Sequence, residues 1–245
     1  MVATSRLIYV HMKSSRAKVH LEALEEEVTA WIERPPYKIS EWDDLDRWHY
    51  YAIDIDGIKC EIPLLVGDFV CCLRSALDQL AWALAHLDST RKLTPRQEKR
   101  VNFLIFHEND STYRDRRLLF PSAVGEVFDT IQPYLRGNAY RDDPLWQLDE
   151  LWRLDKHIMI PANCQKIYVA LPDHEHLGRD ANGRMIFRLP MALKWLRPDE
   201  IKPTITPEIL FGEYMGNFEV SVPRLREIYN FVCDEVIPKF AGFFS

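Results

Sequence analysis

The spacing of apolar residues divides the chain into helices and short strands. In residues 5–33 apolar side chains recur at helical spacing between glutamates, and Pro35 and Pro36 then stop the helix. A second long helix is expected over residues 63–87. On its helical wheel, apolar residues such as Val66 and Leu73 gather on one side and polar residues on the other.

Further helices are indicated by capping residues and prolines after residue 90. A short helix is expected near residues 95–100, followed by irregular chain. Proline marks the start or the end of three more helices, which are expected over residues 121–133, over residues 144–161 with Asp143 as the cap, and over residues 223–244, where Pro238 kinks or ends the helix.

Alternating segments rich in β-branched and aromatic residues predict three pairs of strands. The pairs are residues 37–42 with 47–55, residues 164–172 with 183–190 around Asn182-Gly183, and residues 206–214 with 217–222 around Met215-Gly216. No internal repeat or Gly/Ser linker divides the sequence. We therefore predict one α+β domain over residues 1–245, predominantly helical, in which a helical bundle carries small antiparallel strand pairs.

Composition narrows the possible partners. The net charge of −6 does not favour nucleic acid or an anionic membrane, and the one basic stretch, residues 91–117, is typical of a solvated loop. No segment approaches the ~20 apolar residues of a membrane span. The five cysteines include no C-x-x-C pair, which favours reduced thiols and a cytoplasmic location.

One polar constellation is a candidate site. Arg74 lies at the edge of the apolar face of the helix over residues 63–87, and Asp78 is one turn away on the same face. Asp155 falls within the apolar stripe of the helix over residues 144–161, where an unpaired carboxylate would be costly. We expect Arg74 to pair with Asp155, with His157 close by. The cluster of Arg74, Asp78, Asp155 and His157 is either catalytic or a buried pair that fixes helix register.

The same two helices carry a family resemblance. The segments "VGDFVCCLRSALDQLAWALA" and "PLWQLDELWRLDKH" resemble a widespread group of uncharacterised bacterial and phage proteins, which share a G-D-x-x-x-N-L-R-S-A-L-D-H-L-x-W helix and a later I-D-K-H segment. The R-x4-H within that helix is similar to the motif of HEPN ribonucleases, which cleave RNA without metal. The resemblance implies a His as general acid or base and Arg74 as the phosphate-stabilising cation. This chain has Gln79 at the His position and Cys72 at the Asn position.

Two functions of different classes follow. The preferred one is a non-catalytic binding or interaction protein, with an unknown protein or small molecule as partner and a possible homodimer. The alternative is a HEPN-like, metal-independent ribonuclease that acts on RNA through Arg74 with His157 or His86. No cofactor is expected. "DHEH" at 173–176 is interpreted as an exposed turn, because no further metal ligands follow at a defined spacing.

Overall fold

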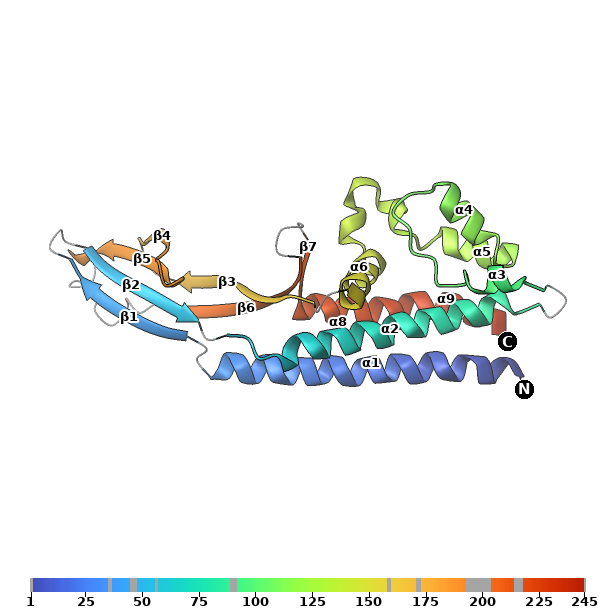
Figure 1. Cartoon of the computed structure of the whole chain (residues 1–245), viewed down its shortest axis with the longest axis horizontal. Coiled ribbons are helices and arrows are strands. Elements are labelled where there is room, and N and C mark those ends of the chain that lie inside the picture. The colour runs from blue at the N-terminus through green and yellow to red at the C-terminus, as the bar shows by residue number, and fades with distance from the viewer. Residues whose placement is uncertain are drawn as a thin grey trace. The chain divides into compact units, whose positions relative to one another are not determined.

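The computed structural model describes residues 2–34, 37–44, 48–55, 57–88, 92–157, 160–170, 173–192, 204–213 and 218–244. These residues confirm a predominantly helical α+β fold with two small antiparallel sheets (Figure 1). The chain divides into two compact units. A helical unit comprises residues 1–25, 61–161 and 211–245, and a sheet unit comprises residues 26–60 and 162–210. The expectation of one domain that folds as a whole stays a prediction.

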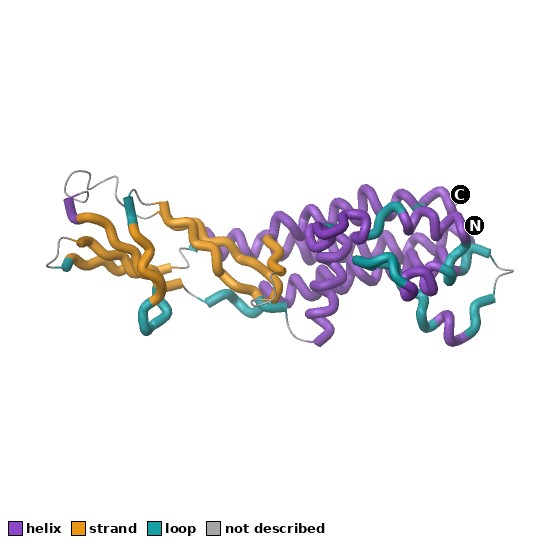
Figure 2. The backbone as a smooth tube through the Cα atoms, turned by 90° about the horizontal axis from the view of Figure 1, so that it is seen from above, coloured by secondary structure: helices purple, strands orange, loops and turns teal. Residues whose placement is uncertain are grey.

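The helical unit contains most of the helices (Figure 2). They are α1 (Val2–Glu33), which continues into the sheet unit, α2 (Glu61–Ala85), α3 (Pro95–Glu98), α4 (Ser111–Arg117), α5 (Ser122–Asp129), the 3-10 segment η1 (Pro133–Asp142), α6 (Pro144–His157), α8 (Val222–Asn230), the π-helical segment η2 (Phe231–Val236), α9 (Ile237–Lys239) and the 3-10 segment η3 (Ala241–Phe244). In both views the first part of α1 runs alongside α2.

The core of this unit forms where the periodicity of α2 predicts it. The apolar side of the α2 wheel is buried throughout, with Val66, Val70, Leu73, Leu77, Leu80 and Leu84 fully covered. Three aromatic rings from separate segments pack together beside it, with centroid distances of 5.0 Å between Phe103 and Phe128 and 5.0 Å between Phe128 and Phe240. Burial of this apolar surface is the main stabilising contribution to the unit.

Helix boundaries follow local capping chemistry. The predicted cap of α6 is confirmed, because Asp143 Oδ1 accepts the backbone N–H of Leu145 at 2.9 Å. The irregular chain expected after residue 100 instead contains α4. Its cap is Asp110, which accepts the N–H of Tyr113 at 2.8 Å, and the buried Tyr113 ring anchors the helix. A single buried residue leaves too short an apolar pattern for this helix to be recognised from sequence.

The sheet unit contains a four-stranded antiparallel sheet. Its order is β1-β2-β5-β4, formed by β1 (Tyr37–Asp43), β2 (Trp48–Ile55), β5 (Met185–Pro190) and β4 (Glu175–Arg179). The β1–β2 hairpin is confirmed, with Trp42 opposite Tyr50. Alternate residues of the central strands cover one face, where Tyr51, Ile53, Met185, Phe187 and Leu189 form the core.

The second predicted hairpin is wrong in one strand. Gly183 does occupy a turn before β5, with a φ of +80°, but the preceding partner is β4 rather than residues 164–172. Glu175 and His176, predicted as part of an exposed turn, lie in β4, and the His176 ring stacks on Phe187. The side chains of β4 are largely exposed, so this strand lacks the apolar pattern by which a strand is recognised from sequence.

The third strand pair is confirmed within a separate sheet of order β3-β6-β7. Its strands are β3 (Ala162–Ala170), β6 (Thr204–Glu213) and β7 (Phe218–Ser221). Gly212 has a φ of +140°, and a Cβ there would come within 2.2 Å of the Phe218 carbonyl oxygen, so the close approach requires glycine. Met215 and Gly216 lie outside the described residues. Within the described part of the chain, no helix is long and apolar enough to cross a membrane.

Candidate functional site

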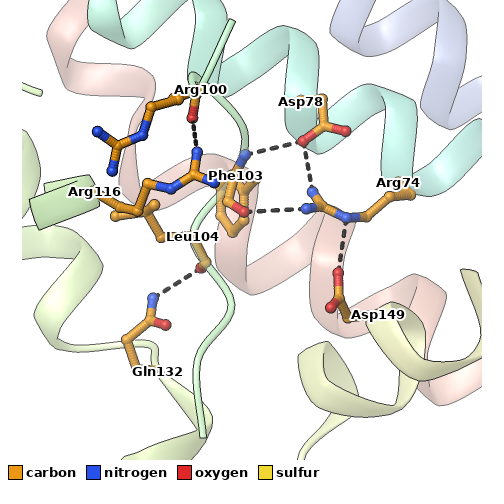
Figure 3. A network of polar contacts seen from close by, with 8 residues as sticks. All are labelled: Arg74, Asp78, Arg100, Phe103, Leu104, Arg116, Gln132 and Asp149. Carbon is orange, nitrogen blue, oxygen red and sulfur yellow. Dashed lines mark hydrogen bonds and ion pairs between the residues drawn. The ribbon is translucent and has the colours of Figure 1, made fainter. Parts of the chain in front are cut away.

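Arg74 is fully buried on α2, with 2% of its surface exposed, and its guanidinium has protein partners on three sides (Figure 3). Nη1 donates to Asp78 Oδ1 at 2.7 Å, and Nε donates to Asp149 Oδ1 on α6 at 3.1 Å. Nη2 donates to the carbonyl of Phe103 at 3.2 Å. The burial that would be costly for an isolated cation is thus compensated by two carboxylates and a backbone acceptor.

The same network attaches an extended segment, residues 101–106, to the helices. Asp78 Oδ1 also accepts the N–H of Phe103 at 2.9 Å, so Arg74 and Asp78 together satisfy both backbone groups of that residue. Gln132 acts in the same way, donating to the Leu104 carbonyl and accepting the N–H of Phe106, both at 2.9 Å. A segment without a neighbouring strand needs such side-chain partners for its buried backbone groups.

The predicted pair between Arg74 and Asp155 is not formed. Among the described residues, the ion-pair partners of Arg74 are Asp78 and Asp149, and the Asp155 carboxylate lies instead beside Gly67. Gly67 precedes Arg74 by two turns of α2, which is about 10 Å along the helix. Asp149 precedes Asp155 by nearly two turns of α6 and is the carboxylate at the level of Arg74.

The two aspartates of α6 differ in their electrostatic surroundings. Burial raises the pKa of Asp149 above its ordinary value, and the nearby Arg74 guanidinium opposes that rise without cancelling it. Burial also raises the pKa of Asp155, and the negative charge of Asp68 raises it further. No hydrogen bond or ion pair from the described part of the chain reaches the Asp155 carboxylate, so its charged form is poorly stabilised.

Gly67 makes room for Asp155. A Cβ built on Gly67 would lie 2.4 Å from Asp155 Oδ1, closer than any real contact between such atoms. Glycine in a helix interior costs about 1 kcal/mol relative to alanine. The absence of a side chain at this position therefore allows α6 to approach α2 closely.

The two histidines of the catalytic hypothesis do not contact Arg74. His157 is exposed in the last turn of α6. His86 lies more than three turns beyond Arg74, about 18 Å along the axis, and its Nδ1 is 2.8 Å from the Trp82 carbonyl. Gln79, at the histidine position of the R-x4-H pattern, is exposed to solvent. Arg74, Asp78 and Asp149 thus form one group, while Asp155, His157 and His86 lie elsewhere.

Comparisons with protein-family models, with curated proteins and with solved structures find no match for this chain. No relative therefore assigns a role to these residues. Within the ranges that the structure describes, no three His, Cys, Asp or Glu side chains are arranged to hold a metal ion. Cys71, Cys72 and Cys233 form no disulfide with the residues that the structure describes.

Sequence reasoning missed Asp149 and its neighbour Trp152. The Arg74 guanidinium carbon lies 5.0 Å from the Trp152 ring centroid, and Lys156 Nζ lies 3.5 Å from the same centroid. Asp149, Trp152 and Lys156 follow each other at spacings of three and four residues, so one face of α6 carries all of them. That spacing places Asp149 on the same face as Trp152 and Lys156, but no signal in the sequence sets its height along α2 relative to Arg74.

A second polar cluster in the sheet unit was also missed. His49 is fully buried, with Nδ1 bonded to Asp43 and Nε2 3.2 Å from Glu41 Oε2. Both ring nitrogens face carboxylates of β1. The cluster joins β2 to β1 through side chains.

We predict strong coupling between Arg74 and Asp149. Arg74→Met should lower the free energy of unfolding by about 3–5 kcal/mol, because two carboxylates and the Phe103 carbonyl lose their donor. Adding Asp149→Leu should recover part of the loss, with a coupling energy of roughly 0.5–3 kcal/mol. Urea unfolding measures this cycle. Asp155→Leu is the matched control and should be additive with Arg74→Met within about 0.5 kcal/mol. Strong coupling to Asp155 would contradict the geometry.

Gly67→Ala should reveal the contact with Asp155. In an Asp155→Ala background, the substitution should stabilise the protein by up to about 1 kcal/mol, the gain normally seen in a helix interior. In the wild-type background that gain should be lost or reversed, because the new methyl group meets the carboxylate. Urea unfolding of the four proteins decides the matter, and an equal effect of Gly67→Ala in both backgrounds would refute the contact.

Asp155 should make stability depend on pH. A raised pKa means that the folded state holds a proton at pH values where the unfolded chain has released it. The contribution of Asp155 to the free energy of unfolding therefore falls as the pH rises from the ordinary aspartate range, about 4, through the raised pKa. Asp155→Asn should be more stable than wild type at pH 7, and this advantage should shrink towards pH 3. A variant that is less stable at pH 7 would show that the carboxylate has a stabilising partner.

Proposed function

We propose that the protein is a non-catalytic binding protein in which Arg74 is an internal structural residue. The observation that carries the proposal is that Nε and both amino groups of its guanidinium donate to Asp149, Asp78 and the Phe103 carbonyl, with the side chain only 2% exposed. A cation that stabilises phosphate charge must face the substrate. Arg74 faces the interior, and releasing it would break the contacts that hold residues 101–106.

The ribonuclease alternative receives less support from the geometry. It needs a general acid or base close to the cation, within hydrogen-bonding reach of the same phosphodiester. His86 lies about 18 Å along the axis of α2 from Arg74. His157 lies in the last turn of α6 and is not among the described residues that bond to Arg74. The basic stretch is also partly neutralised internally, since Arg117 Nη2 pairs with Asp129 Oδ2 at 2.9 Å.

The net charge of the protein also argues against RNA as the partner. The net charge of −6 opposes non-specific attraction to nucleic acid, which depends on cations that neutralise phosphates. We therefore propose a small molecule or a protein as the partner, bound in the cytoplasm by a protein that acts without chemistry at the Arg74 network.

RNA cleavage tests the proposal. Purified protein incubated with total RNA in the presence of a chelator should leave the RNA intact, as judged on a denaturing gel. His86→Ala and His157→Ala are suitable companion variants, because both side chains are at least partly exposed and their removal should not unfold the protein. Cleavage by wild type that either variant abolishes, with unchanged urea unfolding, would establish the ribonuclease instead.

A further inference from the structure

A cavity of about 320 Å³ lies between the start of η1 and the C-terminal helical segments of the helical unit. Such a volume is at the lower end of the range for small-molecule pockets, roughly 300–1,000 Å³. Its walls combine three apolar side chains, Ile131, Leu135 and Phe231, with four charged ones, Arg136, Asp143, Glu235 and Lys239. Gln132, which holds the backbone of Leu104 and Phe106, also lines the cavity, but none of the four charged residues belongs to the Arg74 network.

The π-helical segment η2 shapes one wall of the cavity. The N–H of Ile237 donates to the carbonyl of Val232, five residues back, whereas a regular α-helix would use the residue four back. Pro238 follows directly and has no N–H to donate, which disfavours a regular α-helical turn here. Phe231 and Glu235 both project from η2 into the cavity lining. π-Helical turns are frequent at functional sites.

Asp143 fixes one cation in the opposite wall. Its Oδ1 caps α6, and its Oδ2 accepts Nε of Arg136 at 2.7 Å. Asp143 is itself buried, so its bonding capacity is used by the protein. The hydrogen bond from Arg136 to Asp143 uses Nε. The two terminal amino groups of the Arg136 guanidinium remain for a bidentate contact with a carboxylate.

The remaining two charged side chains form no hydrogen bond or ion pair with the other residues that the structure describes. Lys239 adds a second cation to the lining, and Glu235 adds a carboxylate. With Arg136 and Asp143 already paired, the lining presents positive donors and a negative acceptor around an apolar surface. A dianion such as phosphate would meet repulsion from Glu235, and a purely apolar ligand would leave the exposed charges of Glu235 and Lys239 without a partner.

From this lining we infer that the cavity binds a free α-amino acid with an apolar side chain. The ligand carboxylate lies against Arg136 and Lys239, its ammonium against Glu235, and its side chain against Ile131, Leu135 and Phe231. Each charged group of the ligand then has an oppositely charged partner. The inference rests on the proposed binding function and gives that function a class of ligand. It involves no catalysed reaction.

Calorimetric titration of the intact protein with L-leucine and L-phenylalanine tests the inference. At least one should bind with a dissociation constant below about 1 mM. Two analogues dissect the charges: 4-methylpentanoate lacks the ammonium of leucine, and 3-methylbutylamine lacks its carboxylate. Each should bind at least about tenfold more weakly, since each loses a charge-assisted contact. Equal binding of 4-methylpentanoate and leucine would overturn the zwitterion assignment, and no binding of either amino acid would overturn the site.

Variants locate the binding. Glu235→Gln and Lys239→Gln change side chains that form no hydrogen bond or ion pair with the rest of the described chain. Each change should weaken leucine binding by about tenfold. Lys18→Gln removes a cation from an exposed ion pair on α1 and should leave the affinity unchanged. Unchanged affinity in both Glu235→Gln and Lys239→Gln would place any binding elsewhere. RNA cleavage is scored separately on the same preparation, so a failed titration with intact RNA refutes the ligand and leaves the proposed function standing.

Discussion

The burial of one guanidinium organises the helical unit. Arg74 is held on the boundary of the α2 core, and three acceptors from α2, α6 and the segment 101–106 meet at it. An uncompensated charge at this depth would be costly, so α6 and residues 101–106 must both be in place for α2 to bury its apolar face. The network thereby couples helix packing to the position of a segment that belongs to neither helix nor sheet.

The extended segment shows how that coupling works. Phe103 and Leu104 are buried, and both backbone groups of Phe103 and the carbonyl of Leu104 bond to Asp78, Arg74 and Gln132 rather than to a neighbouring strand. The Phe103 ring then packs against Phe128, which joins this segment to α5. Polar satisfaction of the backbone and aromatic packing of the side chains support the same position, which is the consistency expected of a specified native state.

Sequence patterns identified the features that depend on local chemistry. The apolar face of α2, the Asp143 cap and the β1–β2 hairpin all follow from periodicity, capping and turn residues close in the chain. The choice between Asp149 and Asp155 does not, because it depends on where α6 crosses α2. Periodicity places a residue on a face and leaves open its height along the neighbouring helix. The same limit explains the strand error, since β5 pairs with β2 and β4 through contacts that no local pattern specifies.

Asp155 is the informative exception to the rule that buried charges are paired. Its position within an apolar stripe correctly indicated a half-buried carboxylate, but Gly67 accommodates it by shape rather than by charge. Arg74 does not reach Asp155, because Asp155 lies beside Gly67, which is two turns of α2, about 10 Å, from Arg74. A buried Arg-carboxylate network therefore joins α2, α6 and residues 101–106, while Asp155 keeps a raised pKa and makes stability depend on pH without taking part in that network.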